Sequence, residues 1–161
     1  MVFGMTPFTF FHVLLSLVGI VTGLVVLYGW LHSDRMSRWT AAFLFSTLAT
    51  TITGFLFPFH GMTPAIVVGI LSTVILIVAI VALYRSHLAG RWRAIFVICS
   101  AVALYLNVFV LVAQAFQKVP ALNALAPTGS EPPFAVVQGI VLLAFLLAGY
   151  LAVNRFHPTA A

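Results

Sequence analysis

Four polar side chains recur at helical spacing in the otherwise apolar stretch that ends at residue 118. They follow one another at intervals of seven, seven and four residues, which places them on one face of a single helix. They are Ser100, Asn107, Gln114 and Lys118. Amide and ammonium groups are costly in hydrocarbon unless they face a helix bundle or a wet cavity. This face therefore predicts a binding site and not a lipid-facing surface.

Two histidines are candidates for metal or redox chemistry. His12 lies four residues before Ser16 in the first apolar run, and His60 lies in a turn between two prolines. Imidazoles in such positions can ligate a haem iron or another metal, or hydrogen-bond a quinone oxygen, and the Met62 thioether suits Cu(I). The structural alternative is that His12 bonds to Ser16 or a neighbouring helix and that His60 caps a turn. Haem b, copper and quinone therefore stay open as cofactors.

Pairs of residues suited to catalysis are scarce. His12 and Ser16 are one helical turn apart, which is more typical of a packing hydrogen bond than of a catalytic dyad. Lys118 and Glu131 are opposite charges in one exposed loop, where an ion pair is weak. Neither Asp nor Glu lies within an apolar run, so the carboxylate proton relay of many transporters is missing. We expect a non-enzymatic protein, with a small oligomeric channel or transporter as an alternative.

The composition indicates an integral membrane protein. Of the 161 residues, 63% are hydrophobic and 6% are charged, and the mean hydropathy is +1.22, whereas soluble domains carry roughly a quarter charged residues. The net charge of +5 comes from basic residues scattered singly at the ends of apolar runs, which predicts membrane flanks and no nucleic-acid surface. Cys99 is the single cysteine, so an internal disulfide or a cysteine cluster is excluded.

Five apolar runs are long enough to cross a hydrocarbon core of roughly 30 Å. They are residues 8–30, 39–56, 64–84, 94–116 and 135–154, and the last two are joined by a proline-rich loop at 117–133. The predicted fold is an all-α, single-domain bundle of five transmembrane helices. No Lys or Arg precedes the first run and no cleavage motif follows it, so we expect that run to remain as a span.

Basic residues predict the orientation of the bundle. All six arginines fall on one side of the predicted spans and Lys118 falls alone on the other, and an excess of Lys and Arg marks the cytoplasmic face. The arginines are Arg35, Arg38, Arg85, Arg91, Arg93 and Arg155. Trp30, Trp39 and Trp92 lie at the same end, where indole rings favour the headgroup region. We expect the N-terminus outside and the C-terminus in the cytoplasm.

Small and polar residues mark the expected inward faces. In the first run a helical stripe that begins at His12 ends in the pair Gly19 and Gly23, and such a pair lets another helix approach closely. Most intramembrane polar groups lie in the outer half, so we predict an outward-facing polar pocket formed by spans one, two, four and five and roofed by the loop 117–133. Its predicted residues are His12, Ser16, Thr51, His60, Asn107, Gln114, Lys118, Glu131 and Gln138. The candidate metal ligands are His12, His60 and Met62.

Three stretches resemble a family of small multi-pass proteins of the bacterial inner membrane. They are TPFTFFHVLLSLVGI (6–20), TTITGFLFPFHGMTP (50–64) and LYLNVFVLVAQAFQKVPALNALAPTGSEPPF (104–134). The resemblance covers most of the chain. It implies an inner-membrane location, and it carries over no catalytic residue because no activity is assigned to that family. We expect the lipid bilayer and a second copy or another membrane subunit as partners, and a role in binding or as an accessory subunit of a membrane assembly.

Overall fold

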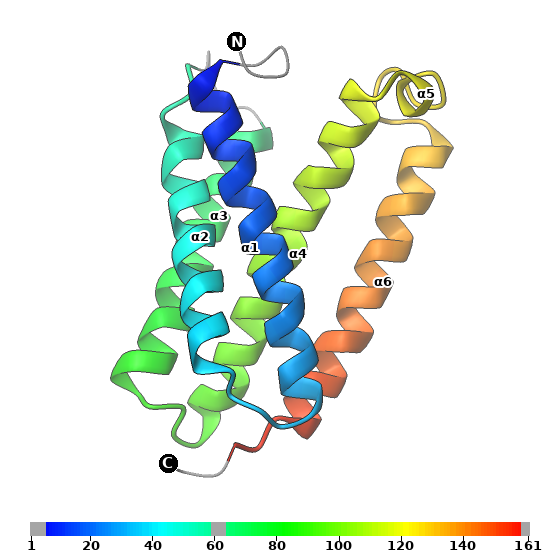
Figure 1. The fold of residues 1–161 in the computed structure, drawn as a ribbon. Coiled ribbons are helices and arrows are strands. Elements are labelled where there is room, and N and C mark those ends of the chain that lie inside the picture. The colour runs from blue at the N-terminus through cyan, green and yellow to red at the C-terminus, as the bar shows by residue number, and fades with distance from the viewer. Residues whose placement is uncertain (1–5, 59–63, 159–161) are drawn as a thin grey trace.

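The computed structural model describes residues 6–58 and 64–158, which form helices joined by loops, without strands. Its elements are α1 (Pro7–Leu31), α2 (Ser37–Phe55), α3 (Pro64–Ile80), the π-helix η1 (Val81–Arg85), α4 (Arg91–Lys118), α5 (Pro120–Asn123) and α6 (Pro132–Arg155) (Figure 1). Within the described ranges, four helical segments are long and apolar enough to cross a membrane: α1, α3 together with η1, α4 and α6. The predicted all-helical class is confirmed, and the four segments suggest a multi-pass membrane protein, one candidate span fewer than the five predicted.

The helix ends follow from local sequence. Thr6 caps α1, where its Oγ1 accepts a hydrogen bond from Thr9 N at 3.2 Å, and Pro7 occupies the first helical position. The predicted loop 117–133 is shorter than expected, because α4 continues through Lys118 and α5 fills part of the loop. Pro132 then opens α6, at the position where a missing N–H costs nothing.

Consecutive long helices are antiparallel neighbours in space. α1 lies beside α2, α2 beside α3 and α3 beside α4, and α4 also contacts α1. α6 packs against α4 and, at one end, against α1 (Figure 1). The α1–α2 loop, the η1–α4 loop and the end of α6 lie together at one end of the bundle, and α5 lies at the other (Figure 1). The end formed by the two loops and the end of α6 carries the arginines and is called the basic end below.

The hydrophobic core lies at the basic end. Trp30, Phe43, Phe96 and Phe156 are each only 1% exposed. The Trp30 ring lies 5.4 Å from that of Phe96 and 5.9 Å from that of Phe156, measured between centroids. Four large aromatic rings from four segments of the chain are therefore buried there, and their packing stabilises the contacts between the helices.

The segment after α6 is tied to this core by hydrogen bonds. Arg93 donates through Nη1 to the carbonyl of Val153 at 2.8 Å and to that of Phe156 at 2.5 Å. His157 N donates to Ser33 Oγ at 2.9 Å, so this segment also reaches the α1–α2 loop. The guanidinium thus satisfies carbonyls that the end of a helix leaves without partners.

The predicted glycine pair of α1 allows the expected close approach. A Cβ at Gly23 would lie 2.6 Å from Leu104 Cδ1 and 2.9 Å from the Phe43 ring, and a Cβ at Gly19 would lie 3.1 Å from Thr47 Oγ1. Both α2 and α4 therefore approach α1 at these two positions, as small residues at this spacing permit.

Packing is looser toward the α5 end. α1 has no buried residue between Pro7 and Val18, and α4 has none between Asn107 and Ala115. In the same direction α1 and α6 diverge (Figure 1). The molecule therefore combines a tight basic end with an open opposite half.

Candidate functional site: an interhelical cavity

A cavity of about 840 Å³ occupies the looser half of the bundle. α1, α2, α3 and α4 all contribute to its walls, and Phe57 and Pro58 line it beyond the end of α2. The residues with polar side chains that line it are Thr9, His12, Ser16, Thr50, Thr51, Ser72, Asn107, Gln114 and Lys118. All but Ser72 come from α1, α2 and α4, so the cavity has a polar wall opposite the mainly apolar α3.

Six of the predicted pocket residues meet in this cavity. They are His12, Ser16, Thr51, Asn107, Gln114 and Lys118. Three different helices bring them together, and on each helix they share the face that the spacing predicted. Thr9, Thr50 and Ser72 also line the cavity and were not predicted as site residues. Their signal was present, because each lies three or four residues from another small or polar lining residue.

Two predicted pocket residues lie elsewhere, which corrects the expected walls. Gln138 on α6 donates through Nε2 to the carbonyl of Phe109 at 3.0 Å and does not line the cavity. The fourth wall is α3 and not α6, because α3 packs against both α2 and α4 and closes that side. Ala65, Gly69 and Ser72 form part of this wall.

Glu131 is engaged in its own turn. Its carboxylate accepts hydrogen bonds from Thr128 N at 3.0 Å, Thr128 Oγ1 at 2.9 Å and Ser130 N at 3.1 Å. Desolvation acts to raise the pKa of this carboxyl, but the hydrogen bonds outweigh it and hold the pKa of Glu131 below its ordinary value. Glu131 therefore orders the turn that leads into α6 and does not line the cavity.

The remaining predicted site residues, His60 and Met62, lie outside the described residues. Of the three candidate metal ligands, only His12 is therefore placed. Within the ranges 6–58 and 64–158, no group of three or more His, Cys, Asp or Glu residues is close enough together to hold a metal ion.

The orientation of the His12 ring is set by Thr53, which was not predicted as its partner. His12 Nδ1 and Thr53 Oγ1 lie 2.8 Å apart. The Thr53 hydroxyl has one proton, which it donates to the carbonyl of Ala49 at 2.8 Å or of Thr50 at 3.1 Å. Because those carbonyls can only accept, the two contacts of Thr53 Oγ1 are satisfied together when it accepts from His12 Nδ1–H. The neutral ring is thereby held in the Nδ1–H tautomer, which leaves a lone pair on Nε2.

Hydrogen-bond donors line the α4 side of the cavity. Asn107 Nδ2 lies 3.5 Å from Thr47 Oγ1, at the limit of a hydrogen bond, where α1, α2 and α4 meet. The side chains of Gln114 and Lys118, further along α4, have no hydrogen-bond or ion-pair partner in the part of the chain that is described. The cavity therefore offers free amide and ammonium donors on α4 and a free acceptor, His12 Nε2, on α1.

The threonines of α2 add acceptors. Thr50 Oγ1 donates to the carbonyl of Ser46 at 2.8 Å, and Thr51 Oγ1 donates to that of Thr47 at 2.9 Å. With their protons used within the helix, these hydroxyls face the cavity as acceptors.

No protein-family model, curated protein or solved structure matches the chain. Function is therefore inferred from the cavity and its residues.

Proposed function

We propose that this chain is a non-enzymatic membrane protein that binds a small amphipathic molecule in the interhelical cavity, either alone or as an accessory subunit. The observation that carries this proposal is the cavity itself. Its volume of about 840 Å³ lies within the range of roughly 300–1,000 Å³ typical of small-molecule sites. A polar wall facing an apolar wall suits a ligand with a polar head and an apolar body.

The polar groups narrow the chemistry of the ligand. Asn107, Gln114 and Lys118 offer donors, which suit a carbonyl or ether oxygen, and His12 Nε2 offers an acceptor for a hydroxyl. A quinone, whose reduced form carries hydroxyls, matches both sets. The remaining lining residues are mostly aliphatic or aromatic and would surround an apolar tail.

We also propose that the chain crosses the membrane five times, with α2 as the fifth span, and that the cavity faces outward. α2 has 19 residues and is about 28 Å long at 1.5 Å per residue. It is less apolar than the other long helices because its inward face carries hydroxyl residues, which are buried and would not meet lipid. They are Thr40, Ser46, Thr47 and Thr50. The hydroxyl of Ser46, for example, donates to the carbonyl of Ala42 at 2.7 Å, so these groups add little cost inside the bundle.

The location we propose is the bacterial cytoplasmic membrane, with the N-terminus outside. The arginines at the basic end support this orientation, because cytoplasmic loops carry the excess of positive charge. Lys118, beside α5, is the single basic residue of the opposite end. The family resemblance of the sequence supports the bacterial membrane. In this orientation the interhelical cavity faces the outside.

The test measures which small molecule stays bound to the purified chain, and whether removing one hydrogen-bond donor from the cavity reduces its content. The full chain is purified, and bound small molecules are extracted into organic solvent and quantified by mass spectrometry. Both Gln114 and Gln117 are exposed on α4, but Gln114→Leu removes an amide that lines the cavity, whereas Gln117→Leu removes one that does not. We expect one compound at about one copy per chain, reduced about two- to tenfold by Gln114→Leu alone.

Two results would contradict the proposal. One is that no compound is enriched over the bulk lipid of the same membranes. The other is that Gln114→Leu and Gln117→Leu reduce its content equally, because the cavity then has no special part in retaining it.

A redox or metal site at His12 is the second candidate, and it is favoured by one observation. The Nδ1–H of His12 is held by Thr53, which leaves Nε2 as a preoriented ligand. An absorption spectrum and elemental analysis of the purified protein test this candidate. A haem Soret band or stoichiometric copper that disappears in His12→Ala would favour it over the binding of a metal-free ligand.

A further inference from the structure

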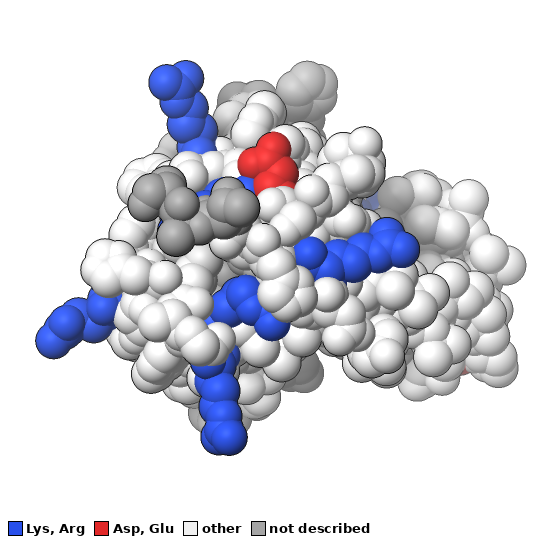
Figure 2. All heavy atoms as spheres, turned by 90° about the horizontal axis from the view of Figure 1, so that it is seen from below, with Lys and Arg blue, Asp and Glu red and all other residues white. Residues whose placement is uncertain are grey.

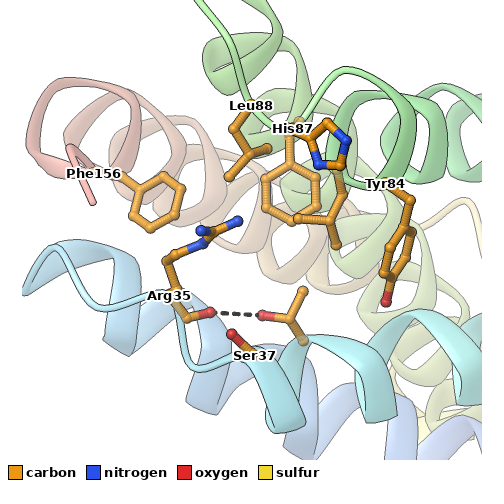
Figure 3. Close-up of a pocket in the computed structure, with 9 residues that line it drawn as sticks. Arg35, Ser37, Tyr84, His87, Leu88 and Phe156 are labelled. Atoms are coloured by element: carbon orange, nitrogen blue, oxygen red, sulfur yellow. Dashed lines mark hydrogen bonds between the residues drawn. The ribbon is translucent and has the colours of Figure 1, made fainter. Parts of the chain in front are cut away.

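A second cavity lies at the basic end, remote from the first. Its volume is about 190 Å³. The α1–α2 loop, the start of α2, the η1–α4 loop and the segment after α6 surround it (Figure 3). Five polar side chains from these segments and from η1 line it: Arg35, Ser37, Thr40, Tyr84 and His87. At roughly 30 Å³ per molecule of liquid water, the volume equals that of about six waters, which is enough for one small tetrahedral anion.

Apart from Thr40, whose hydroxyl donates to the Arg35 carbonyl, none of these side chains has a hydrogen-bond or ion-pair partner within residues 6–58 and 64–158. The sequence holds two acidic residues, Asp34 and Glu131. Asp34 Oδ1 accepts from Met36 N at 2.9 Å, and Glu131 lies beyond α5, at the other end of the bundle. Neither carboxylate forms an ion pair with Arg35.

Arg35 extends into the cavity beside an apolar wall formed by Leu83, Leu88, Phe96 and Phe156. Its guanidinium points into the cavity between Leu88, His87 and Phe156 (Figure 3). Phe156 is 1% exposed and Leu88 is 9% exposed, so part of the cavity wall is shielded from water. Its backbone is anchored, because Thr40 Oγ1 donates to the Arg35 carbonyl at 3.0 Å. An unpaired guanidinium in such surroundings favours the binding of an anion.

The backbone around the cavity is strained. Every non-glycine residue with a positive φ in the described ranges lies in the two loops that border it. They are Ser33 (62°), Met36 (43°), His87 (49°) and Leu88 (59°). Such conformations cost energy and cluster where function constrains the backbone.

The cavity also lies where phosphate groups occur. Trp39 and Trp92, both exposed, lie at the same end and mark the headgroup region. Arginine side chains spread over this end of the molecule, with little acidic surface among them (Figure 2). This basic surface attracts anions toward the cavity.

We propose that this cavity binds a phosphate group, carried either by a phospholipid headgroup or by soluble phosphate. The Arg35 guanidinium forms a two-pronged, charge-assisted pair with two phosphate oxygens. The hydroxyls of Ser37 and Tyr84 and a ring N–H of His87 donate to the remaining oxygens.

The test measures thermal unfolding of the full chain in a neutral detergent, with three probes at equal ionic strength: dihexanoyl phosphatidylglycerol, inorganic phosphate and sodium chloride. We expect a phosphate-bearing probe to raise the unfolding temperature. Arg35→Gln should weaken the apparent affinity at least about tenfold. The matched control is Arg38→Gln. Arg38 lies three residues after Arg35, is exposed and does not line the cavity, so removing its charge should leave the affinity unchanged.

The outcomes separate the two sources of phosphate. A response to inorganic phosphate identifies soluble phosphate as sufficient, and a response to the lipid alone identifies a headgroup. The proposal is overturned if sodium chloride raises the unfolding temperature as much, if neither phosphate probe acts, or if Arg38→Gln weakens binding as much as Arg35→Gln.

Two further variants keep the test decisive. If Arg35→Gln does not fold, Tyr84→Phe removes one donor from an exposed side chain, and it must weaken the affinity for the proposal to stand. Gln114→Leu, at the other end of the molecule, must leave the affinity unchanged. A lipid effect lost in Gln114→Leu would place the probe in the interhelical cavity and would overturn this inference without touching the proposed function.

Discussion

At the scale of single residues, the hydrogen bonds of the Thr53 hydroxyl determine which ring nitrogen of His12 is protonated. A histidine on a transmembrane helix could present either ring nitrogen to its surroundings. Here the contacts of Thr53 with His12 and with a carbonyl of its own helix are both satisfied when Nδ1 donates, which leaves Nε2 as the acceptor. The chemistry of the cavity therefore depends on a residue that lies behind its wall.

Replacing Thr53 by Val should release the His12 ring from this tautomer. The substitution removes the acceptor of Nδ1–H while nearly preserving side-chain shape. In ¹⁵N-labelled protein at about pH 8, where a histidine of ordinary pKa is neutral, we expect His12 to be protonated at Nδ1 in the natural chain and at Nε2 in Thr53→Val. Thr51→Val is the control, because Thr51 bonds to Thr47 and not to His12. A natural chain protonated at Nε2 would refute the assignment.

The turn before α6 should respond to pH through Glu131. The pKa of this carboxyl is lowered on folding, so its contribution to stability is present above the pKa of the unfolded chain and is lost as pH falls through the folded value. In a carboxyl ¹³C titration, Thr128→Ala should raise the pKa by removing one donor. Ser130→Ala keeps all three donors to the carboxylate and should leave it nearly unchanged. An ordinary glutamate pKa in the natural chain would contradict this account.

At the scale of elements, α1 divides into two halves with different tasks. Its first half lines the interhelical cavity, and its second half is buried against α2 and α4. Gly19 and Gly23 begin the buried half, where neighbouring side chains occupy the space that a Cβ would take. The glycines therefore determine how closely the other two helices can approach.

Substituting Ala for Gly23 should destabilise the bundle. The new Cβ would lie within 3 Å of both Leu104 and the buried Phe43, so one of them has to move. We expect a loss of about 1–3 kcal/mol in the free energy of unfolding, measured in mixed micelles. Gly139→Ala on α6 is the control, because a Cβ there meets nothing within 4 Å, and it should be neutral or slightly stabilising. Equal effects at both positions would argue against the predicted steric cost.

The sequence predicted the long helices and which residues share a face, but not which helices are neighbours. The helical period is a local property, so His12, Asn107 and Gln114 could be assigned to inward faces from spacing alone. α3 and α6, in contrast, are apolar over most of their surface, and in lipid an apolar face does not distinguish inside from outside. Gln138 suggested that α6 faced the pocket, but its amide bonds to the α4 backbone instead. The partnership of His12 with Thr53 likewise depends on how α1 and α2 pack.

At the scale of the whole molecule, the number of spans decides which loops share a side of the membrane. With five spans, the α1–α2 and η1–α4 loops lie on the same side and the α5 region on the other. If α2 lay on the surface and only four segments crossed, the η1–α4 loop would change sides.

Cysteine labelling should distinguish the two topologies. In a Cys99→Ala background, cysteines are placed one at a time by Ser37→Cys, Ala89→Cys and Ala124→Cys, all at exposed positions. With intact cells and a membrane-impermeant maleimide, we expect labelling at position 124 alone. Lysed cells, in which all three should react, provide the control. Labelling at position 89 but not at position 124 would support four spans.

The uneven packing along the bundle axis has a mechanical consequence. Rings from four segments fix the helices at the basic end, whereas the half around the interhelical cavity has few buried residues to separate when it opens. We therefore expect the helices to pivot about the arginine-bearing end, so that the opposite half of the bundle opens and closes. We expect amide hydrogens in the first half of α1 to exchange faster than those in its second half. The same pivot would let the cavity adapt its width to ligands of different size. A bound ligand would restrict this motion, and the conformational entropy lost would reduce its affinity.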